Sequence, residues 1–170
     1  MSELLTVELR ALGAGDIDAV LRIQAQCYGA DFVEPREVFA RRLQRSGHCS
    51  WAAVQGGEVL AYLAAYWSCP GAITPLNGDF AEYSDASVLY LHDMAVSTEA
   101  AGRGLAKRMV EVAKQQARAR GVQRTALVSV QGSQHYWERQ GYKVEPVTNA
   151  AQQQHLASYG EGALYMVGFI

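Results

Sequence analysis

The spacing of apolar and polar positions changes several times along the chain and predicts alternating helices and strands. Apolar residues recur at helical spacing in four segments, which we expect to be helices: one from residue 17 behind Asp16, one at 35–45, one at 104–120 and one at 133–140. Short apolar or alternating runs predict strands at 4–12, 50–55, 58–67, 88–96, 125–130, 142–144 and 164–170.

Glycine and proline mark the connections between these elements. Gly56-Gly57 lies between two predicted strands and is typical of a tight β-hairpin. Gly121 is a natural stop for the helix before it. Residues 69–86 are rich in Gly, Pro and Asn and predict a long loop, which in a compact domain is often functional.

The element order predicts a single α/β domain covering residues 1–170. No internal repeat, low-complexity segment or Pro/Gly/Ser linker divides the chain. The β-α-β units toward the C-terminus imply parallel strand pairs, whereas the hairpin implies an antiparallel pair. We therefore expect a mixed sheet with helices on both faces.

Composition narrows the setting without naming a function. No run of about 18 apolar residues indicates a transmembrane helix, and Met1–Arg10 lacks the apolar core of a signal peptide. Cys27, Cys49 and Cys69 form no CxxC pair, so neither a disulfide framework nor a metal site is indicated. We expect a cytoplasmic protein without a membrane partner.

The net charge of −2 conceals an asymmetry between the two parts of the chain. Residues 1–99 hold 13 acidic and 6 basic side chains, a balance of −7, and residues 100–170 hold 4 and 9, a balance of +5. The basic part could hold an anionic ligand and the acidic part a cationic one. Two solvated faces are the simpler interpretation. Net charge and the lack of interleaved aromatic residues argue against nucleic-acid binding.

The segment with the clearest chemistry is the loop that enters the helix at 104–120. Gly102, Arg103 and Gly104 follow a strand directly, and the backbone N–H groups of a starting helix are unpaired and point one way. Such a site binds phosphate oxygens, and glycine allows their close approach. A dinucleotide loop would need glycine at Lys107, and no Gly-Lys-Ser/Thr occurs. A purely structural turn would explain Gly-Arg-Gly equally well.

Residues 89–144 resemble the cofactor-binding core of the GNAT acetyltransferase superfamily. That family's motif, Arg/Gln-x-x-Gly-x-Gly/Ala, matches residues 101–106 except that Ala101 replaces the opening residue. The stretch 133–144, with its Tyr-Trp-Glu-Arg-Gln-Gly-Tyr sequence, is similar to the family's fourth helix and next strand. The resemblance implies a twisted, mostly antiparallel mixed sheet of about 6–7 strands with a splayed central strand pair.

The same resemblance implies acetyl-CoA as cosubstrate and suggests the residues that hold it. Backbone groups of the 88–96 strand would bind the pantetheine arm, and the backbone amides of the glycine loop would bind the pyrophosphate. Lys107, Arg108 or Arg139 could meet other phosphates or be solvated charges. The expected cofactor-binding residues are Met94, Ala95, Val96, Ala101, Gly102, Arg103, Gly104, Leu105, Ala106, Ser133 and Trp137.

His92 is the candidate general base for removing a proton from an acceptor amine, because imidazole titrates near neutral pH. Regular alternation would place Tyr90, His92 and Met94 on one face of the strand and Asp93 on the other. The segment is similar to the serotonin N-acetyltransferase branch, with His92 matching the second of two histidines and Tyr90 replacing the first. Direct proton abstraction, a water relay through Tyr90, and a purely structural histidine all remain open.

Several groups could protonate the departing thiolate. The family's usual tyrosine lies four residues before the glycine of its Gly-Phe pair, which is Trp137 here. Indole cannot transfer a proton usefully near neutral pH. Tyr136, Tyr142 or water could serve, or the thiolate could leave unassisted.

The acceptor pocket is expected between the first two helices, the 69–86 loop and the loop before the last strand. Tyr28 and Glu34 are the preferred acceptor-binding residues. An aromatic cluster with nearby carboxylates could hold a cationic arylalkylamine, and its other aromatic members are Phe32, Tyr66, Trp67, Tyr83 and Tyr159. Packing in the core and the hairpin is the ordinary alternative for these aromatic residues. Arg41, Arg42 and Arg45 could instead bind an acceptor carboxylate or form a solvated face.

The sequence thus predicts an N-acetyltransferase for a small-molecule amine. A catalytically silent coenzyme A-binding module is the main alternative, and a protein-modifying acetyltransferase is a third. A homodimer is the default expectation for the assembly.

Overall fold

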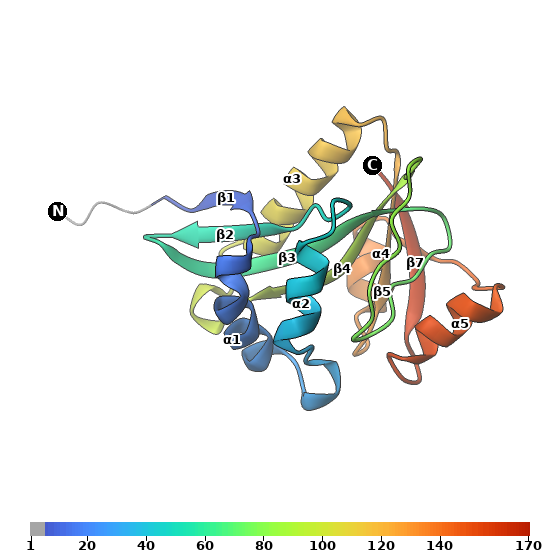
Figure 1. Ribbon diagram of the computed structural model, residues 1–170, viewed down its shortest axis with the longest axis horizontal. Coiled ribbons are helices and arrows are strands. Elements are labelled where there is room, and N and C mark those ends of the chain that lie inside the picture. The colour runs from blue at the N-terminus through green and yellow to red at the C-terminus, as the bar shows by residue number, and fades with distance from the viewer. Residues whose placement is uncertain (1–5) are drawn as a thin grey trace.

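Seven strands form one sheet in the computed structural model, which describes residues 6–170 (Figure 1). Across the sheet the order is β1-β2-β3-β4-β5-β7-β6, and only β4 and β5 run parallel. The strands are β1 (Glu8–Ala11), β2 (Trp51–Gln55), β3 (Glu58–Ser68), β4 (Val88–Val96), β5 (Arg124–Ser129), β6 (Lys143–Val144) and β7 (Leu164–Phe169).

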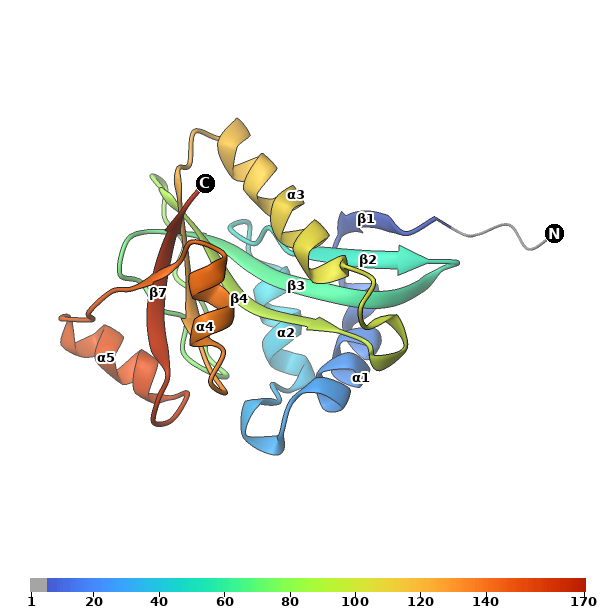
Figure 2. The same ribbon diagram turned by 180° about the vertical axis from the view of Figure 1, so that it is seen from behind.

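Helices cover both faces of this sheet. The five α-helices are α1 (Ile17–Cys27), α2 (Arg36–Leu43), α3 (Leu105–Ala119), α4 (Gln134–Arg139) and α5 (Ala150–Ala157). The first two lie on one face, and α3 and α4 lie on the opposite one, as the two views show (Figures 1 and 2). Short 3-10 helices occur at Ala14–Asp16, Ala30–Phe32 and Thr98–Ala100.

The apolar core follows from alternation along the long strands. Leu63, Leu89 and Leu91 pack toward α3 and its buried Met109, whereas Tyr62 packs toward α1. A third cluster, around Tyr66, Ile73, Phe80, Tyr90 and Tyr165, joins the long β3–β4 loop to the same face as α1 and to Leu156 of α5. The 69–86 loop is therefore a packed part of the molecule and covers one end of the sheet.

The predicted mixed, mostly antiparallel sheet with helices on both faces is confirmed. The hairpin at Gly56-Gly57 has φ angles of 58° and 83°, the left-handed backbone that such turns require. Gly121, at φ 76°, ends α3. Only the β4–β5 pair is parallel, so the expectation of several parallel pairs near the C-terminus was wrong. The predicted first strand begins at residues that lie outside those described.

The helix α5 was missed because its sequence carries almost no amphipathic pattern. None of its residues is fully buried. Its start is set instead by Asn149, whose side chain accepts a hydrogen bond from Gln152 N at 3.1 Å. This helix matters because it carries the chain back to Tyr159 and β7 beside the candidate site. Among residues 6–170, no helix is long and apolar enough to cross a membrane.

The two halves of the sheet separate between β4 and β5. Their pairing begins at Val88–Arg124 and ends at Leu91–Leu127. Beyond that point β4 stays paired with β3 as far as Val96, whereas β5 continues with β7. In both views β5 and β7 cross the direction of β2 and β3 (Figures 1 and 2). The sheet is therefore open at its centre.

We expect Met109→Ala to lower the free energy of unfolding by about 2–5 kcal/mol, because it leaves a cavity between α3 and the sheet. Met109 is fully buried, at 0% exposure. Urea unfolding followed by circular dichroism measures this loss. Gln115→Ala on the exposed face of the same helix is the control and should change stability by less than about 0.5 kcal/mol. Equal effects of the two variants would contradict the assigned packing.

Candidate active site at the bulge in β4

A β-bulge at His92 shapes the centre of the opening. In the β3–β4 ladder Ala64 pairs with Asp93 and Ala65 with Leu91, which leaves His92 as an extra residue. The predicted alternation is therefore wrong at this point. His92 and Asp93 both lie on the face that carries α1, and Met94 packs on the α3 face with Leu63. Two titratable side chains are thus brought side by side.

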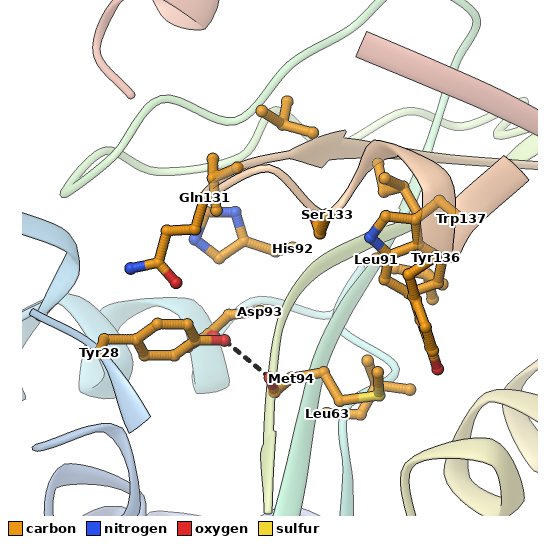
Figure 3. Close-up of a pocket in the computed structure, with 13 residues that line it drawn as sticks. Tyr28, Leu63, Leu91, His92, Asp93, Met94, Gln131, Ser133, Tyr136 and Trp137 are labelled. Carbon is orange, nitrogen blue, oxygen red and sulfur yellow. Dashed lines mark hydrogen bonds between the residues drawn. The ribbon is translucent and has the colours of Figure 1, made fainter. Parts of the chain in front are cut away.

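A pocket of about 290 Å³ fills the opening between β4 and β5. Leu91, Met94 and Trp137 line it from the α3–α4 face, and Tyr28 lines it from the α1 face (Figure 3). The pocket therefore passes through the sheet. The other lining residues are Leu63, His92, Asp93, Leu127, Val128, Val130, Gln131, Ser133 and Tyr136.

A smaller chamber of about 40 Å³ continues this pocket on the α1 face. Both share Tyr28, His92 and Asp93, together with Val128 and Val130 of the opposite wall. The chamber's remaining lining residues are Phe32, Glu34, Leu76 and Tyr159. Four members of the predicted acceptor set, Tyr28, Phe32, Glu34 and Tyr159, therefore meet around His92. The predicted members Tyr66, Trp67 and Tyr83 line neither cavity.

The edge of β4 that faces the opening offers backbone groups to a ligand. Ser97 N bonds Leu60 O at 2.8 Å, so by antiparallel alternation Met94 and Val96 turn their backbone groups away from β3. Two side chains occupy their carbonyls: the Tyr28 hydroxyl donates to Met94 O at 2.7 Å, and the Cys27 thiol donates to Val96 O at 3.1 Å. The backbone of Ala95 faces β3 instead, since Ala95 pairs with Tyr62.

The glycine loop has the backbone that its sequence predicts. Gly102 and Gly104 have φ angles of 77° and 72°, and a Cβ added at either would meet no atom within 4 Å. Gly104 directly precedes α3, whose first turn carries no acidic side chain. The Leu105 side chain is buried in the core, and the Arg103 guanidinium donates to Gln55 Oε1 at 3.1 Å. The loop therefore presents its backbone amides, with the dipole of α3 behind them, to an anion.

Glu34 is buried, and although it lines the chamber its carboxylate is fully hydrogen-bonded within the protein, so its role in binding an acceptor stays a prediction. Its carboxylate accepts hydrogen bonds from Arg42 at 2.7 and 2.6 Å, from His92 Nε2 at 2.9 Å and from Asn77 N at 2.8 Å. Burial alone would raise its pKa, but His92 and Arg42 together lower it well below the ordinary range. Gln24 fixes the backbone of Glu34 with two further hydrogen bonds.

Arg41 and Arg42 at the end of α2, and Arg45 just after it, do not offer a site for a carboxylate. Arg42 is 1% exposed, and besides Glu34 it donates to Gly78 O at 2.7 and 2.9 Å. Arg41 and Arg45 both contact Asp79. The expectation of a solvated basic face, or of an acceptor carboxylate bound there, is therefore wrong for Arg42.

The two ring nitrogens of His92 have different hydrogen-bond partners. An ionised Glu34 only accepts, so Nε2 carries a hydrogen. Nδ1 lies 3.3 Å from the hydroxyl oxygen of Tyr159, whose own proton is donated to Thr74 O at 2.6 Å. The Tyr159 oxygen can therefore accept a hydrogen bond from a protonated Nδ1. Nδ1 is therefore the ring nitrogen that does not contact Glu34.

Asp93 lies next to His92 and forms no ion pair among the described residues. Its carboxylate accepts a hydrogen bond of 2.5 Å from the Tyr62 hydroxyl. Burial raises its pKa above the ordinary value, with the Tyr62 hydrogen bond opposing that shift. The expectation that Asp93 points away from His92 was wrong, because no bulge was anticipated.

The remaining candidates divide between the pocket and the core. Tyr136 is 40% exposed and lines the pocket, with its ring edge against Trp137. Tyr90 is buried and lines neither cavity, with its ring centroid 6.3 Å from that of His92, and its part in a proton path stays a prediction. The Tyr142 hydroxyl is bonded to Thr125, and burial raises its pKa to about 12. Ser133 occupies the N-cap position of α4, but its hydroxyl is hydrogen-bonded to the Ser129 hydroxyl and makes no capping hydrogen bond to the helix backbone.

A family model described as Acetyltransferase (GNAT) family matches residues 17–142. The chain belongs to the GNAT family. No curated protein sequence matches it. The solved structures that this GNAT chain resembles include the ribosomal-protein-S18-alanine N-acetyltransferase of Escherichia coli, with 16% identity, a TM-score of 0.70 and coverage of 97% of this chain and 94% of that one.

Two further structures show that GNAT folds serve more than one chemistry. PaiA N-acetyltransferase from Thermoplasma acidophilum, in complex with coenzyme A, is 13% identical with a TM-score of 0.66, covering 98% of this chain and 100% of that one. GphF GNAT-like decarboxylase, in complex with isobutyryl-CoA, is 14% identical with a TM-score of 0.71, covering 95% and 98%. At these identities the likeness establishes the fold alone. Membership of the serotonin branch stays a prediction.

We expect Glu34→Gln to lower the free energy of unfolding at pH 7 by about 3–5 kcal/mol, because Arg42 keeps its buried charge without a counter-charge. The folded-state pKa of Glu34 is lowered, so its stabilising effect is complete above the ordinary carboxyl pKa of about 4.5 and is lost as pH falls below it. Urea unfolding at pH 7 and pH 4 should therefore show a smaller difference between the two proteins at pH 4. A difference that does not depend on pH would contradict an ionised Glu34.

Proposed function

We propose that the protein transfers an acetyl group from acetyl-CoA to the amine of a small molecule by direct attack of the amine on the thioester. The observation that carries this proposal is the passage through the sheet. It joins the edge of β4 that no strand covers beyond Leu91, on which a pantetheine arm could bind, to a chamber that holds His92. A nucleophile in the chamber and a thioester in the pocket can therefore meet between β4 and β5.

The cosubstrate would be held mainly by backbone groups. Met94 and Val96 would face the pantetheine arm, and the amides of the loop at Gly102–Gly104 would receive the pyrophosphate at the start of α3. The side chains of Trp137 and Ser133 would line the thioester end. Ala101 provides no side chain for the phosphates, and its replacement of the family's Arg or Gln leaves these amides in place.

His92 would act as the general base in this reaction. The acceptor ammonium gives a proton to Nδ1, directly or through one water, and the Tyr159 oxygen and the Glu34 carboxylate stabilise the imidazolium that forms. The amine nitrogen then bonds the carbonyl carbon, the carbon–sulfur bond breaks, and the nitrogen gives its second proton to water as the neutral amide forms. Coenzyme A leaves as a thiolate, which takes its proton from water or from Tyr136 at the pocket wall.

A coenzyme A-binding module without catalytic activity is the second candidate. Trp137 favours it, because the family's usual acid is missing there. The partly exposed Tyr136 beside Trp137 favours the enzyme instead. A cytoplasmic location and a homodimer stay predictions.

We expect His92→Ala to lower kcat/KM for an amine by about 10²–10⁴-fold at pH 7, because it removes the proton acceptor. The loss should shrink toward pH 10, where more of an alkyl amine is unprotonated. Free-thiol release from acetyl-CoA with a panel of amines measures both effects.

His135→Ala is the control for this experiment, because His135 is 84% exposed on α4 and lines neither cavity. An unchanged pH profile in His92→Ala would show that His92 is not the base. Tight coenzyme A binding without thiol release from any amine would favour the binding module.

We expect Gly104→Ala to weaken coenzyme A binding by about tenfold, because a Cβ at φ 72° costs about 1–2 kcal/mol and shifts the amides of the loop. Isothermal titration calorimetry measures the affinity. Gly121→Ala introduces the same backbone strain at φ 76° at the other end of α3. It should lower stability but leave coenzyme A affinity unchanged, and equal affinities of both variants would contradict the assigned loop.

A further inference from the structure

The charges around the chamber are paired, with one exception. Glu34 is saturated by Arg42, His92 and the Asn77 amide. Asp93 lines both the pocket and the chamber, and its carboxylate has the hydroxyls of Tyr62 and Tyr28 and the His92 ring as neighbours but no ion pair among residues 6–170. Figure 3 shows it at the end of the pocket, beside Tyr28 and below the His92 ring. A half-buried carboxylate without a cation beside it is costly, and an incoming cation would offset that cost.

The lining of the two cavities has no group that would receive an anion from an acceptor. Among the described residues, no lysine or arginine lines either cavity. The nearest guanidinium, that of Arg42, is fully engaged by Glu34 and Gly78 O. A carboxylate placed next to the reacting amine would therefore lie close to Asp93 and Glu34 without a counter-charge.

We propose that Asp93 binds the ammonium group of the acceptor, and that the acceptors are amines without a carboxylate beside the amine, so that amino acids are rejected. This inference rests on the proposed function and adds a specificity residue and a substrate class to it. Asp93 is accordingly distinct from the base: it holds the ammonium while Nδ1 of His92 takes the proton.

The walls of the chamber suit such a cation. Tyr28, Phe32 and Tyr159 surround it with aromatic rings, whose faces attract an ammonium group, and Leu76 adds an apolar side. The bulge is the structural cause, because it puts Asp93 on the same face as His92. The acidic balance of residues 1–99 acts in the same direction, since Tyr28, Glu34 and Asp93 all belong to this part of the chain.

The test compares amines with the amino acids that differ from them only by the carboxylate: tyramine with tyrosine, phenethylamine with phenylalanine, and cadaverine with lysine. Binding to the coenzyme A-loaded protein is measured by calorimetry, and thiol release from acetyl-CoA is measured in parallel. We expect at least one amine to bind about 100-fold more tightly than its amino acid. No amine preference in any pair, or no binding at all, overturns the proposal.

Asp93→Asn separates a binding role from a structural one. Asparagine has the same shape and still accepts the Tyr62 hydrogen bond, so we expect the fold to be kept. Binding of the preferred amine should weaken by about 10–100-fold, and the preference over its amino acid should fall to less than about threefold. Because a buried charge is removed, the Tm should stay the same or rise. A lower Tm with the amine preference intact would assign Asp93 a structural role and overturn the proposal.

Asp18→Asn is the matched control, because it removes the same charge from an exposed carboxylate on α1, 83% exposed. It should leave both affinity and preference unchanged. The proposed function fails separately: if amines bind through Asp93 but no thiol is released, the substrate class stands and the transferase activity does not. If thiol is released equally with amines and amino acids, the activity stands and the substrate class does not.

Discussion

The bulge at His92 is the constraint on which the rest of the site depends. A strand with regular alternation would send His92 and Asp93 to opposite faces of the sheet, and neither cavity could contain both. The extra residue also comes at the point where β4 stops pairing with β5. The bulge and the separation of β4 from β5 therefore occur at the same place in the sheet. The opening, the uncovered edge of β4 and the side-by-side placement of His92 and Asp93 all follow from this part of β4.

A buried network then holds this irregular backbone in place. Glu34 connects the segment before α2 to Arg42 within it, to Asn77 in the β3–β4 loop and to His92 in β4. Such a network stabilises the fold only as a complete set, because each broken contact leaves a charge or a donor without a partner in the interior. Within this network the contact between Glu34 and His92 also determines that Nε2 carries a hydrogen when Glu34 is ionised.

The sequence was most informative where local chemistry decides the structure. Gly56-Gly57, Gly104 and Gly121 indicated their turns correctly because positive φ angles favour glycine. The β4 strand was predicted at Val88–Val96, as observed. Tyr28, Glu34 and His92 were named from the sequence as candidates, and the structure shows that they line the same chamber; their roles stay predictions.

The errors lie where tertiary contacts decide. No local pattern distinguishes a strand with one unpaired residue from a regular one, so Asp93 was placed on the wrong face. The sequence did not distinguish Arg42 from Arg41 and Arg45, which were all expected on one basic face. Arg42 is buried because Glu34 and the Gly78 carbonyl pack against its guanidinium. The helix α5 has no apolar stripe, and its docking beside the 69–86 loop, with His155 bonded to Ile73 O, could not be read from its composition.

The passage through the sheet also bears on the directions from which two ligands would reach the site. Its two mouths lie on opposite faces, one beside α4 and the other beside α1 and Tyr159. In the proposed reaction the cosubstrate and the acceptor would therefore approach the reaction centre from opposite faces of the sheet. An acetylated product of that reaction would carry no positive charge, so it would lose the charge attraction that holds the acceptor at Asp93.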